Sequence, residues 1–213
     1  PLTPCTSDVT GPGLTNTTTT ITYTNNTDAG TATATSQWAG DSNHNPSTAP
    51  DVTFTITPAD TTTVLICPST VTYTGSPLTP CTSNVTGPGL TTTGTITYTN
   101  NTNAGTATAT AQWAGDSNHN PSTAPPLTFT ITPAPVTVTA ATPTTQAYGT
   151  PIPTITYTTD PVLTATDWLT APTCAVYTNS DTTFSTPLTG TIDAGTYVTH
   201  CSAEVSANYA ASY

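Results

Sequence analysis

The residues best suited to metal binding lie in a short polar segment that the chain contains twice, at Asp41–Asn45 and Asp116–Asn120. Its D-x-N-x-N spacing matches the first oxygen ligands of a calcium-binding loop. The twelfth position of such a loop requires a bidentate glutamate, but here it holds Val52 or Leu127. The segment therefore favours an Asx-rich turn over a weak calcium site, and we expect no bound metal. The candidate ligands are Asp41, Asn43, Asn45, Asp116, Asn118 and Asn120.

The other titratable residues show no pattern typical of catalysis. None of the histidines, His44, His119 and His200, belongs to an evident Ser/Cys–His–Asp arrangement. The aspartates are scattered singly, and the one glutamate is Glu204. General acid–base catalysis needs paired carboxylates or a histidine placed in a pocket. We therefore expect no enzyme activity and no cofactor.

Three tryptophans, Trp38, Trp113 and Trp168, could act as platforms on which sugars stack. The first two fall at inward-facing positions of predicted strands. This register favours a role in the hydrophobic core over a role in ligand binding.

The charge of the chain excludes two classes of partner. It has no lysine or arginine, and its formal net charge is −11. Nucleic acids and anionic membrane surfaces are bound mainly through basic side chains, so we expect neither as a partner. No stretch approaches the ~18–20 consecutive apolar residues of a membrane span, and no signal peptide opens the sequence.

Threonine accounts for 63 of the 213 residues, which suits either strands or a disordered, mucin-like stalk. Strict alternation of apolar residues and threonine in Val52–Ile56 and Leu127–Ile131 favours strands. We therefore predict an all-β protein.

A long internal repeat organises these strands. Pro1–Leu14 returns as Pro77–Leu90, and Ile21–Pro50 returns as Ile96–Pro125, with few substitutions. Repetition at this spacing indicates a module used as a building block. The predicted modules are residues 1–60, 61–134 and 135–213.

The second module predicts an immunoglobulin-like β-sandwich, because short strands alternate with turns. In one of its strands, Ala107, Ala109, Ala111 and Trp113 should face inward. Short proline-containing linkers between modules favour an elongated rod. The predicted strands are Val64–Cys67, Val71–Thr74, Thr95–Thr99, Thr106–Trp113 and Leu127–Thr132.

The five cysteines predict two disulfides and one unpaired residue. Cys67 and Cys81 flank a hairpin-sized segment, while Cys174 and Cys201 lie on two alternating strands and should meet across the core. Cys5 corresponds to Cys81 and has no counterpart of Cys67. Metal binding is the alternative, but the chain has no C-x-x-C motif. Disulfides favour an oxidising, extracytoplasmic compartment.

The third module contains the segments VTVT, YG, PTITY, AGTY and NY. This pattern resembles the MBG domains of bacterial surface proteins. The PLTPCT, NNTNAGTATA and AGDSNHN segments of the first two modules resemble the Ig-like repeats that accompany those domains. The resemblance implies an extracellular, adhesin-like or fibre-forming protein without known catalysis. It supplies no ligand site. The third-module segments lie at Val136–Thr139, Tyr148–Gly149, Pro153–Tyr157, Ala194–Tyr197 and Asn208–Tyr209.

The outer modules are expected to be incomplete. The first lacks a strand corresponding to Thr61–Ser76, and the third lacks a last strand corresponding to Leu127–Thr132. Unpaired edges next to an open core are unstable. Either the polypeptide continues beyond Pro1 and Tyr213, or neighbouring subunits add the missing strands. In the second case, Cys5 would bond to another chain or lie buried at the joint.

Four asparagines satisfy the N-x-[ST] rule for N-glycosylation, and O-linked sugar on threonine is an alternative. Covalent glycans would help to keep a surface with few charges in solution. The four asparagines are Asn16, Asn25, Asn84 and Asn100.

These features together predict a structural subunit of a bacterial extracellular filament or cell-surface fibre, which associates head to tail. The alternative is the stalk or binding module of a surface adhesin that recognises a glycan or a protein.

Overall fold

The structure, a computed structural model, describes residues 1–143, 145–202 and 206–213. Its regular structure consists of strands and one 3-10 turn, η1 (Ala165–Asp167), and these ranges contain no α-helix. The all-β prediction is confirmed. Strands form because β-branched residues alternate with apolar ones over most of the sequence.

The chain forms two compact units, and the second repeat contributes to both of them. The units therefore do not coincide with the three predicted modules. Unit 1 contains Pro1–Leu65, Thr82–Ile96 and Thr110–Pro125, and unit 2 contains Ile66–Cys81, Thr97–Ala109 and Pro126–Tyr213.

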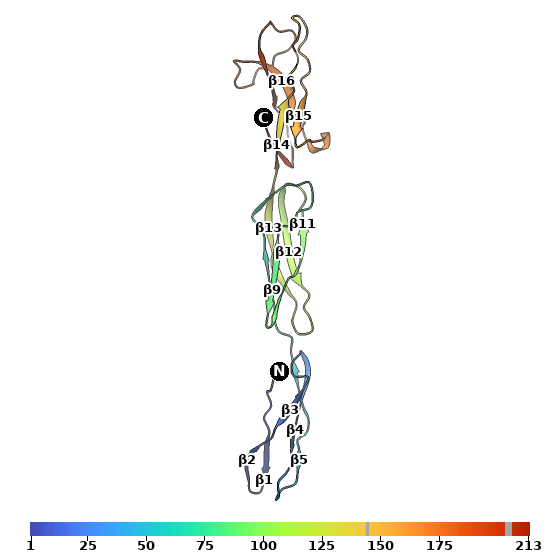
Figure 1. Cartoon of the computed structure of the whole chain (residues 1–213), viewed down its shortest axis with the longest axis vertical. Coiled ribbons are helices and arrows are strands. Elements are labelled where there is room, and N and C mark those ends of the chain that lie inside the picture. Colours follow the sequence, from blue (N-terminus) through green and yellow to red (C-terminus); the bar gives the residue numbers. More distant parts are fainter. Residues whose placement is uncertain (144, 203–205) are drawn as a thin grey trace. The chain divides into compact units, whose positions relative to one another are not determined.

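The strands of the first repeat are β1 (Asp8–Gly11), β2 (Leu14–Thr18), β3 (Ile21–Thr24), β4 (Gly30–Trp38), β5 (Ser47–Thr48) and β6 (Val52–Ile56). β4 is central and pairs antiparallel with β3, β5 and β6 (Figure 1). β1 and β2 form a separate hairpin. Among the side chains of this repeat that the structure describes, those of Ala32 and Ala34 on β4 are buried.

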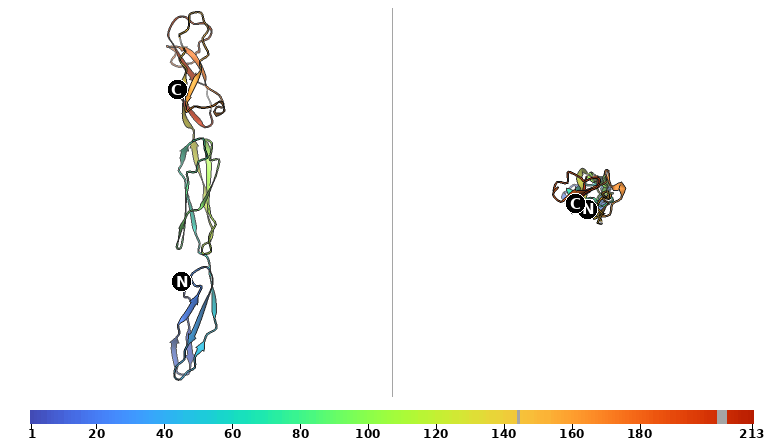
Figure 2. Two further views of the ribbon diagram at one scale, coloured as in Figure 1. Left: turned by 45° about the vertical axis from the view of Figure 1, so that its right-hand side comes forward. Right: turned by 90° about the horizontal axis from the view of Figure 1, so that it is seen from above.

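The strands of the second repeat are β7 (Thr62–Ile66), β8 (Thr70–Thr72), β9 (Thr82–Gly87), β10 (Leu90–Thr92), β11 (Thr95–Thr99), β12 (Gly105–Trp113) and β13 (Ser122–Thr132). They form two sheets, in the orders β10-β9-β7 and β11-β12-β13-β8 (Figures 1 and 2). The sequence predicted five of these strands but missed the β9–β10 hairpin, which turns at Pro88 and Gly89.

The core of the second repeat follows the predicted register. Ala107, Ala109 and Ala111 on β12 are at most 2% exposed, as expected for an inward face. Small side chains on a central strand leave room for large ones from its neighbours. The largest fully buried side chains of this repeat are Val85, Phe129 and Ile131.

The last strands are β14 (Ala134–Ala140), β15 (Tyr157–Asp160), β16 (Thr173–Thr178), β17 (Tyr197–Ser202) and β18 (Tyr209–Ser212). β14 pairs antiparallel with β15 and parallel with β18, just as β8 and β13 pair parallel in the second repeat. β18 follows Asn208 directly, so it is not the last strand corresponding to Leu127–Thr132 that the sequence predicts to be missing. The alternation that places Tyr197, Thr199 and Cys201 on one face of a strand also predicts Ala203 and Val205 there, but these two residues and Glu204 lie outside the described residues.

Candidate functional site

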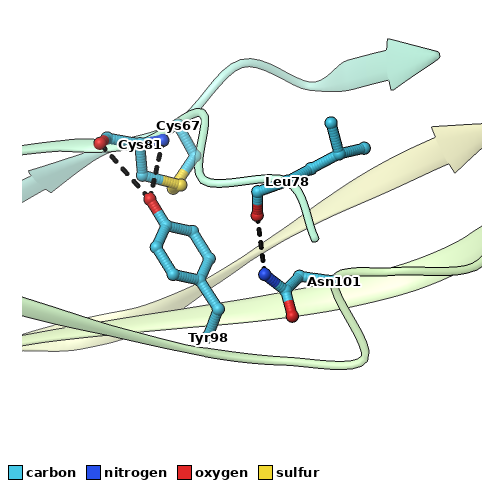
Figure 3. Close-up of a disulfide and its surroundings, with 5 residues drawn as sticks. All are labelled: Cys67, Leu78, Cys81, Tyr98 and Asn101. Carbon is cyan, nitrogen blue, oxygen red and sulfur yellow. Dashed lines mark hydrogen bonds between the residues drawn. A yellow bond between two sulfur atoms is a disulfide. The ribbon is translucent and has the colours of Figure 1, made fainter. Parts of the chain in front are cut away.

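The disulfide Cys67–Cys81 lies beside a tyrosine that holds the backbone of Cys81 (Figure 3). The Tyr98 hydroxyl accepts a hydrogen bond from the Cys81 amide at 2.9 Å and donates one to its carbonyl at 3.3 Å. Next to it, the Asn101 side chain donates to the Leu78 carbonyl at 2.8 Å. This arrangement fixes the segment before β9 at two points.

The first repeat has the same arrangement around a cysteine that is not bonded. Tyr23 accepts from the Cys5 amide at 3.0 Å and donates to its carbonyl at 3.3 Å. Asn26 donates to the Leu2 carbonyl at 2.8 Å. Cys5 is half-buried and is the free cysteine of the described residues. The backbone of Cys5 is therefore held by the same kind of hydrogen bonds as that of Cys81, but Cys5 is not in a disulfide.

The second disulfide joins Cys174 and Cys201, the other pair that the sequence predicts. The expectation that they meet across the core was wrong. Cys174 and Cys201 are direct partners on the antiparallel neighbours β16 and β17, so the bond links adjacent strands of one sheet. Trp168 packs with Cys201 in the buried cluster of the third module.

The repeated polar segment Asp116–Asn120 folds as an Asx turn. The Asp116 carboxylate accepts from the Asn118 amide and from His119 Nδ1, both at 2.8 Å. His119 Nε2 donates to the Pro88 carbonyl at 2.9 Å, and its ring lies 6.1 Å from that of Trp113. The histidine thus links the turn to the β9–β10 hairpin.

Asp41–Asn45 has the same geometry in the first repeat. Asp41 accepts from the Asn43 amide and from His44 Nδ1 at 2.8 Å, and His44 Nε2 donates to the Pro12 carbonyl at 3.0 Å. The His44 ring lies 6.0 Å from that of Trp38. Both turns therefore form in the same way, although their surroundings differ.

Hydrogen bonding shifts the pKa values of the aspartate and the histidine in both turns. A histidine whose two ring nitrogens both donate is favoured in its protonated form. The Pro12 carbonyl and then Asp41 raise the pKa of His44, and the Pro88 carbonyl and then Asp116 raise that of His119. The Asn43 amide and then His44 lower the pKa of Asp41, and the corresponding groups lower that of Asp116.

Several of the six candidate calcium ligands form hydrogen bonds within these turns or to neighbouring segments. One carboxylate oxygen of each aspartate accepts bonds within its own turn, while Asn118 and Asn120 reach the preceding repeat. Among the described residues, no three of His, Cys, Asp or Glu are grouped so that they could hold a metal ion. His200 stacks on Phe184 with ring centroids 4.0 Å apart, far in sequence from the other histidines.

Asn118 connects its turn to the first repeat, and all of these contacts lie within unit 1. Its Oδ1 accepts from the Ala29 amide at 2.7 Å, and its Nδ2 donates to Asp28 at 3.0 Å. Its carbonyl accepts from the Ala59 amide at 2.8 Å, and the Asn120 amide donates to the Ala59 carbonyl at 2.8 Å. The Asx turn is therefore a receptor for the Asp28–Gly30 turn.

Asn208 makes the corresponding contacts within unit 2. Its Oδ1 accepts from the Ala104 amide at 2.8 Å, and its Nδ2 donates to Asn103 at 3.3 Å. Its carbonyl accepts from the Ala134 amide at 2.8 Å. The same latch of an asparagine, an alanine amide and a linker alanine thus occurs twice, although the residues around Asn208 differ from those around Asn118.

Three of the four predicted sequons have exposed asparagines: Asn25, Asn84 and Asn100. Asn25 and Asn100 have φ values of 55° and 56°, in the left-handed conformation that asparagine tolerates in turns. The side chain of Asn16 lies outside those that the structure describes. The side chains of these three asparagines are therefore in contact with solvent.

Sequence reasoning missed the hydrogen-bonding roles of three groups: the tyrosines Tyr23 and Tyr98, the backbone amides of Ala29 and Ala104, and Asn208. A signal for the last two was present in the spacing between alanine and asparagine, which is the same in every module.

No helix among the described residues is long and apolar enough to cross a membrane. Comparisons with family models, curated proteins and solved structures gave no match.

Proposed function

We propose that this chain is a structural subunit of an extracellular filament or cell-surface fibre, built from tandem immunoglobulin-like modules and completed by strands from neighbouring subunits. Two disulfides support an oxidising, extracytoplasmic location. The repeated latch connects successive modules along the chain, which supports a fibre built from tandem modules.

The observation that carries the proposal is the difference between the two repeats at one sheet edge. In the second repeat, β7 pairs along β9. In the first repeat, β1 corresponds to β9 but has only β2 as a partner among the described residues. An open strand edge is a template for a strand from another chain.

The core beneath this edge is correspondingly open. Val85 and Phe129 are 0% and 2% exposed, whereas Val9 and Phe54, their counterparts in the first repeat, are only half-buried. A strand with the sequence pattern of β7 would cover these apolar side chains. Its burial would supply free energy for association.

Cys5 indicates that the added strand would carry a cysteine. In the second repeat, Cys67 follows β7 and bonds to Cys81. A strand in the equivalent position that carries a free thiol would bring it to Cys5. That thiol would not be Cys67, Cys81, Cys174 or Cys201, which are bonded within their own chain. Oxidation of the two thiols by an external oxidant of the disulfide or quinone type would form one S–S bond and release two protons and two electrons.

The function is tested with the 213-residue chain, produced in an oxidising compartment and examined by sedimentation velocity and negative-stain electron microscopy. We expect concentration-dependent assembly into fibres. A chain that stays monomeric at all concentrations would overturn the proposal. Selective binding of such a monomer to one glycan or protein on an array would support an adhesin module instead.

A peptide with the sequence of residues 61–76 tests strand addition directly. We expect it to protect β1 amides from hydrogen exchange and, under mild oxidation, to form a disulfide between its cysteine and Cys5. A peptide in which serine replaces that cysteine should protect more weakly. Equal protection by a scrambled peptide would contradict the strand-addition step.

A further inference from the structure

Each module carries both halves of the latch at the same spacing. An Ala-Gly pair is followed by an asparagine, and the residue numbers 29 and 43, 104 and 118, and 194 and 208 differ by 14 in each case. The alanine precedes a strand (β4, β12 or β17), and the asparagine follows it. The donor turn and the receptor asparagine therefore lie at opposite ends of one strand.

The chain uses only some of these groups. Ala29 donates to Asn118, and Ala104 donates to Asn208. This leaves the donor at Ala194 and the receptor at Asn43, for which the described part of the chain provides no latch partner. The residues that form a latch are more buried than those that do not. Ala29, Ala104, Asn118 and Asn208 are half-buried, whereas Ala194 and Asn43 are exposed.

We propose that Asn43 binds the turn Asp193–Gly195 of a second copy of this chain, forming between subunits the latch that the chain contains twice. This inference rests on the proposed fibre function and identifies one of its contacts. The contact joins different surfaces of the two copies, so it can repeat from one copy to the next, and it extends into a filament when the rotation between copies does not close a ring.

The receptor is already formed in the free chain. Asp41 holds the Asn43 amide at 2.8 Å, as Asp116 holds that of Asn118. In the docked state, Asn43 Oδ1 accepts from the Ala194 amide and Nδ2 donates to the Asp193 carboxylate. The latch between Asn118 and Asp28 shows the same pairing of an amide with an acid.

The donor turn has the matching sequence and a hollow surface. D-A-G-T at Asp193–Thr196 equals Asp28–Thr31. Residues 192–197 line one side of a hollow of about 540 Å³, and residues between 145 and 153 line much of the rest. The turns at 25–31 and 100–106 also border hollows, of about 450 and 400 Å³, but neither Asn118 nor Asn208 lines them. The match between the third turn and the other two therefore rests on its sequence.

One difference predicts a conformational change on docking. Gly30 and Gly105, which follow the engaged alanines, have φ values of +143° and +136°, but Gly195 is not in the positive-φ region. A Cβ on Gly195 would lie 3.5 Å from its nearest neighbour, an ordinary contact. Alanine at 195 is thus compatible with the free turn but strained in the docked one.

The central experiment compares Asn43→Asp, Asp193→Asn and the double variant with wild type. Asn43→Asp removes the donor and places two carboxylates together, so assembly should need a roughly 10- to 100-fold higher concentration. Asp193→Asn should assemble normally, because the Asn208–Asn103 latch pairs two amides. The double variant should recover assembly, since an amide again faces an acid. Sedimentation velocity measures assembly, and thermal unfolding checks the fold.

Gly195→Ala is a second, independent variant. We expect normal thermal stability of the isolated chain but weaker assembly. If wild type forms fibres and both Asn43→Asp and Gly195→Ala assemble equally well, the latch proposal is wrong and the fibre proposal stands. Failure of the double variant to recover assembly would also overturn the latch. If wild type does not assemble, the proposed function itself is wrong, and the latch with it.

Discussion

The first and second repeats carry nearly the same sequence but bury their cores to different extents. Phe129 is 2% exposed in the second repeat, whereas Phe54, on the corresponding strand, is half-buried. The two repeats share their turns, their tyrosine contacts and the alanine face of the central strand. They differ in the strand β7 and the cysteine that follows it. Local sequence therefore forms the strands, while a single strand decides whether the core is closed.

The largest effect should come from the phenylalanines. Phe129→Ala should destabilise the second repeat by about 3–5 kcal/mol, because a fully buried aromatic side chain is lost. Phe54→Ala should cost roughly half as much, since its side chain is already partly in water. Hydrogen exchange of β12 and β4, resolved by mass spectrometry, measures the two losses separately. Equal losses would show that the first repeat has a closed core in solution.

The disulfide should contribute the next largest effect. Cys67→Ala with Cys81→Ala opens a loop with a sequence separation of 14 residues. Loss of a cross-link of this size costs about 3 kcal/mol. Cys5→Ala, the matched control, should leave the isolated chain within about 0.5 kcal/mol of wild type. Chemical denaturation monitored by hydrogen exchange in each repeat checks this, and a large loss for Cys5→Ala would show that its thiol stabilises the fold in another way.

The tyrosine contacts should matter equally in both repeats. Tyr98→Phe and Tyr23→Phe each remove the hydroxyl that bonds to both backbone groups of a cysteine. The distances agree within 0.1 Å, so each change should cost roughly 1 kcal/mol. Local exchange of the following strand, β1 or β9, measures the loss. A much smaller loss for Tyr23→Phe would mean that this contact depends on the disulfide.

Sequence alone predicted the strands in which alternation is strict. β11 and β12 and the alanine face of β12 follow directly from the pattern of threonine and apolar residues. The β9–β10 hairpin was missed because its segments are short and rich in polar residues, with only Pro88 and Gly89 between them. Register is fixed by pairing with β7, which local sequence does not reveal.

The candidate site was harder to predict than the fold. The Asx turn was expected from its D-x-N-x-N spacing, but its role as a receptor depends on the Ala29 amide, 89 residues away. A backbone amide can donate whatever the side chain is, so the residue type does not indicate this contact. Asn208 gave no motif of its own, because only the spacing from Ala194 relates it to Asn118. The disulfide pairs were predictable from the spacing of the cysteines and from the segments that carry them, but their placement within one sheet or between sheets was not.

The smallest effect concerns the histidines, whose turns are alike in both repeats. Hydrogen bonds raise the pKa of His44 and His119 above the ordinary value of 6.5, so their contribution to stability is complete below pH 6.5 and is lost as pH rises through the raised pKa. Asp41 and Asp116 have lowered pKa values, so their contribution is present above 3.8 and is lost as pH falls through the lowered pKa.

Both turns should therefore be most stable between about pH 4 and 6.5, where the aspartate is charged and the histidine is protonated. NMR titration of the imidazole Hε1 signals should give pKa values above 6.5 for His44 and His119. In His119→Gln, only the second turn should lose the pH dependence of its amide exchange, with His44→Gln as the matched variant. Because these turns hold Asn43 and Asn118, a pKa at or below 6.5 would mean that the receptor does not depend on a protonated histidine.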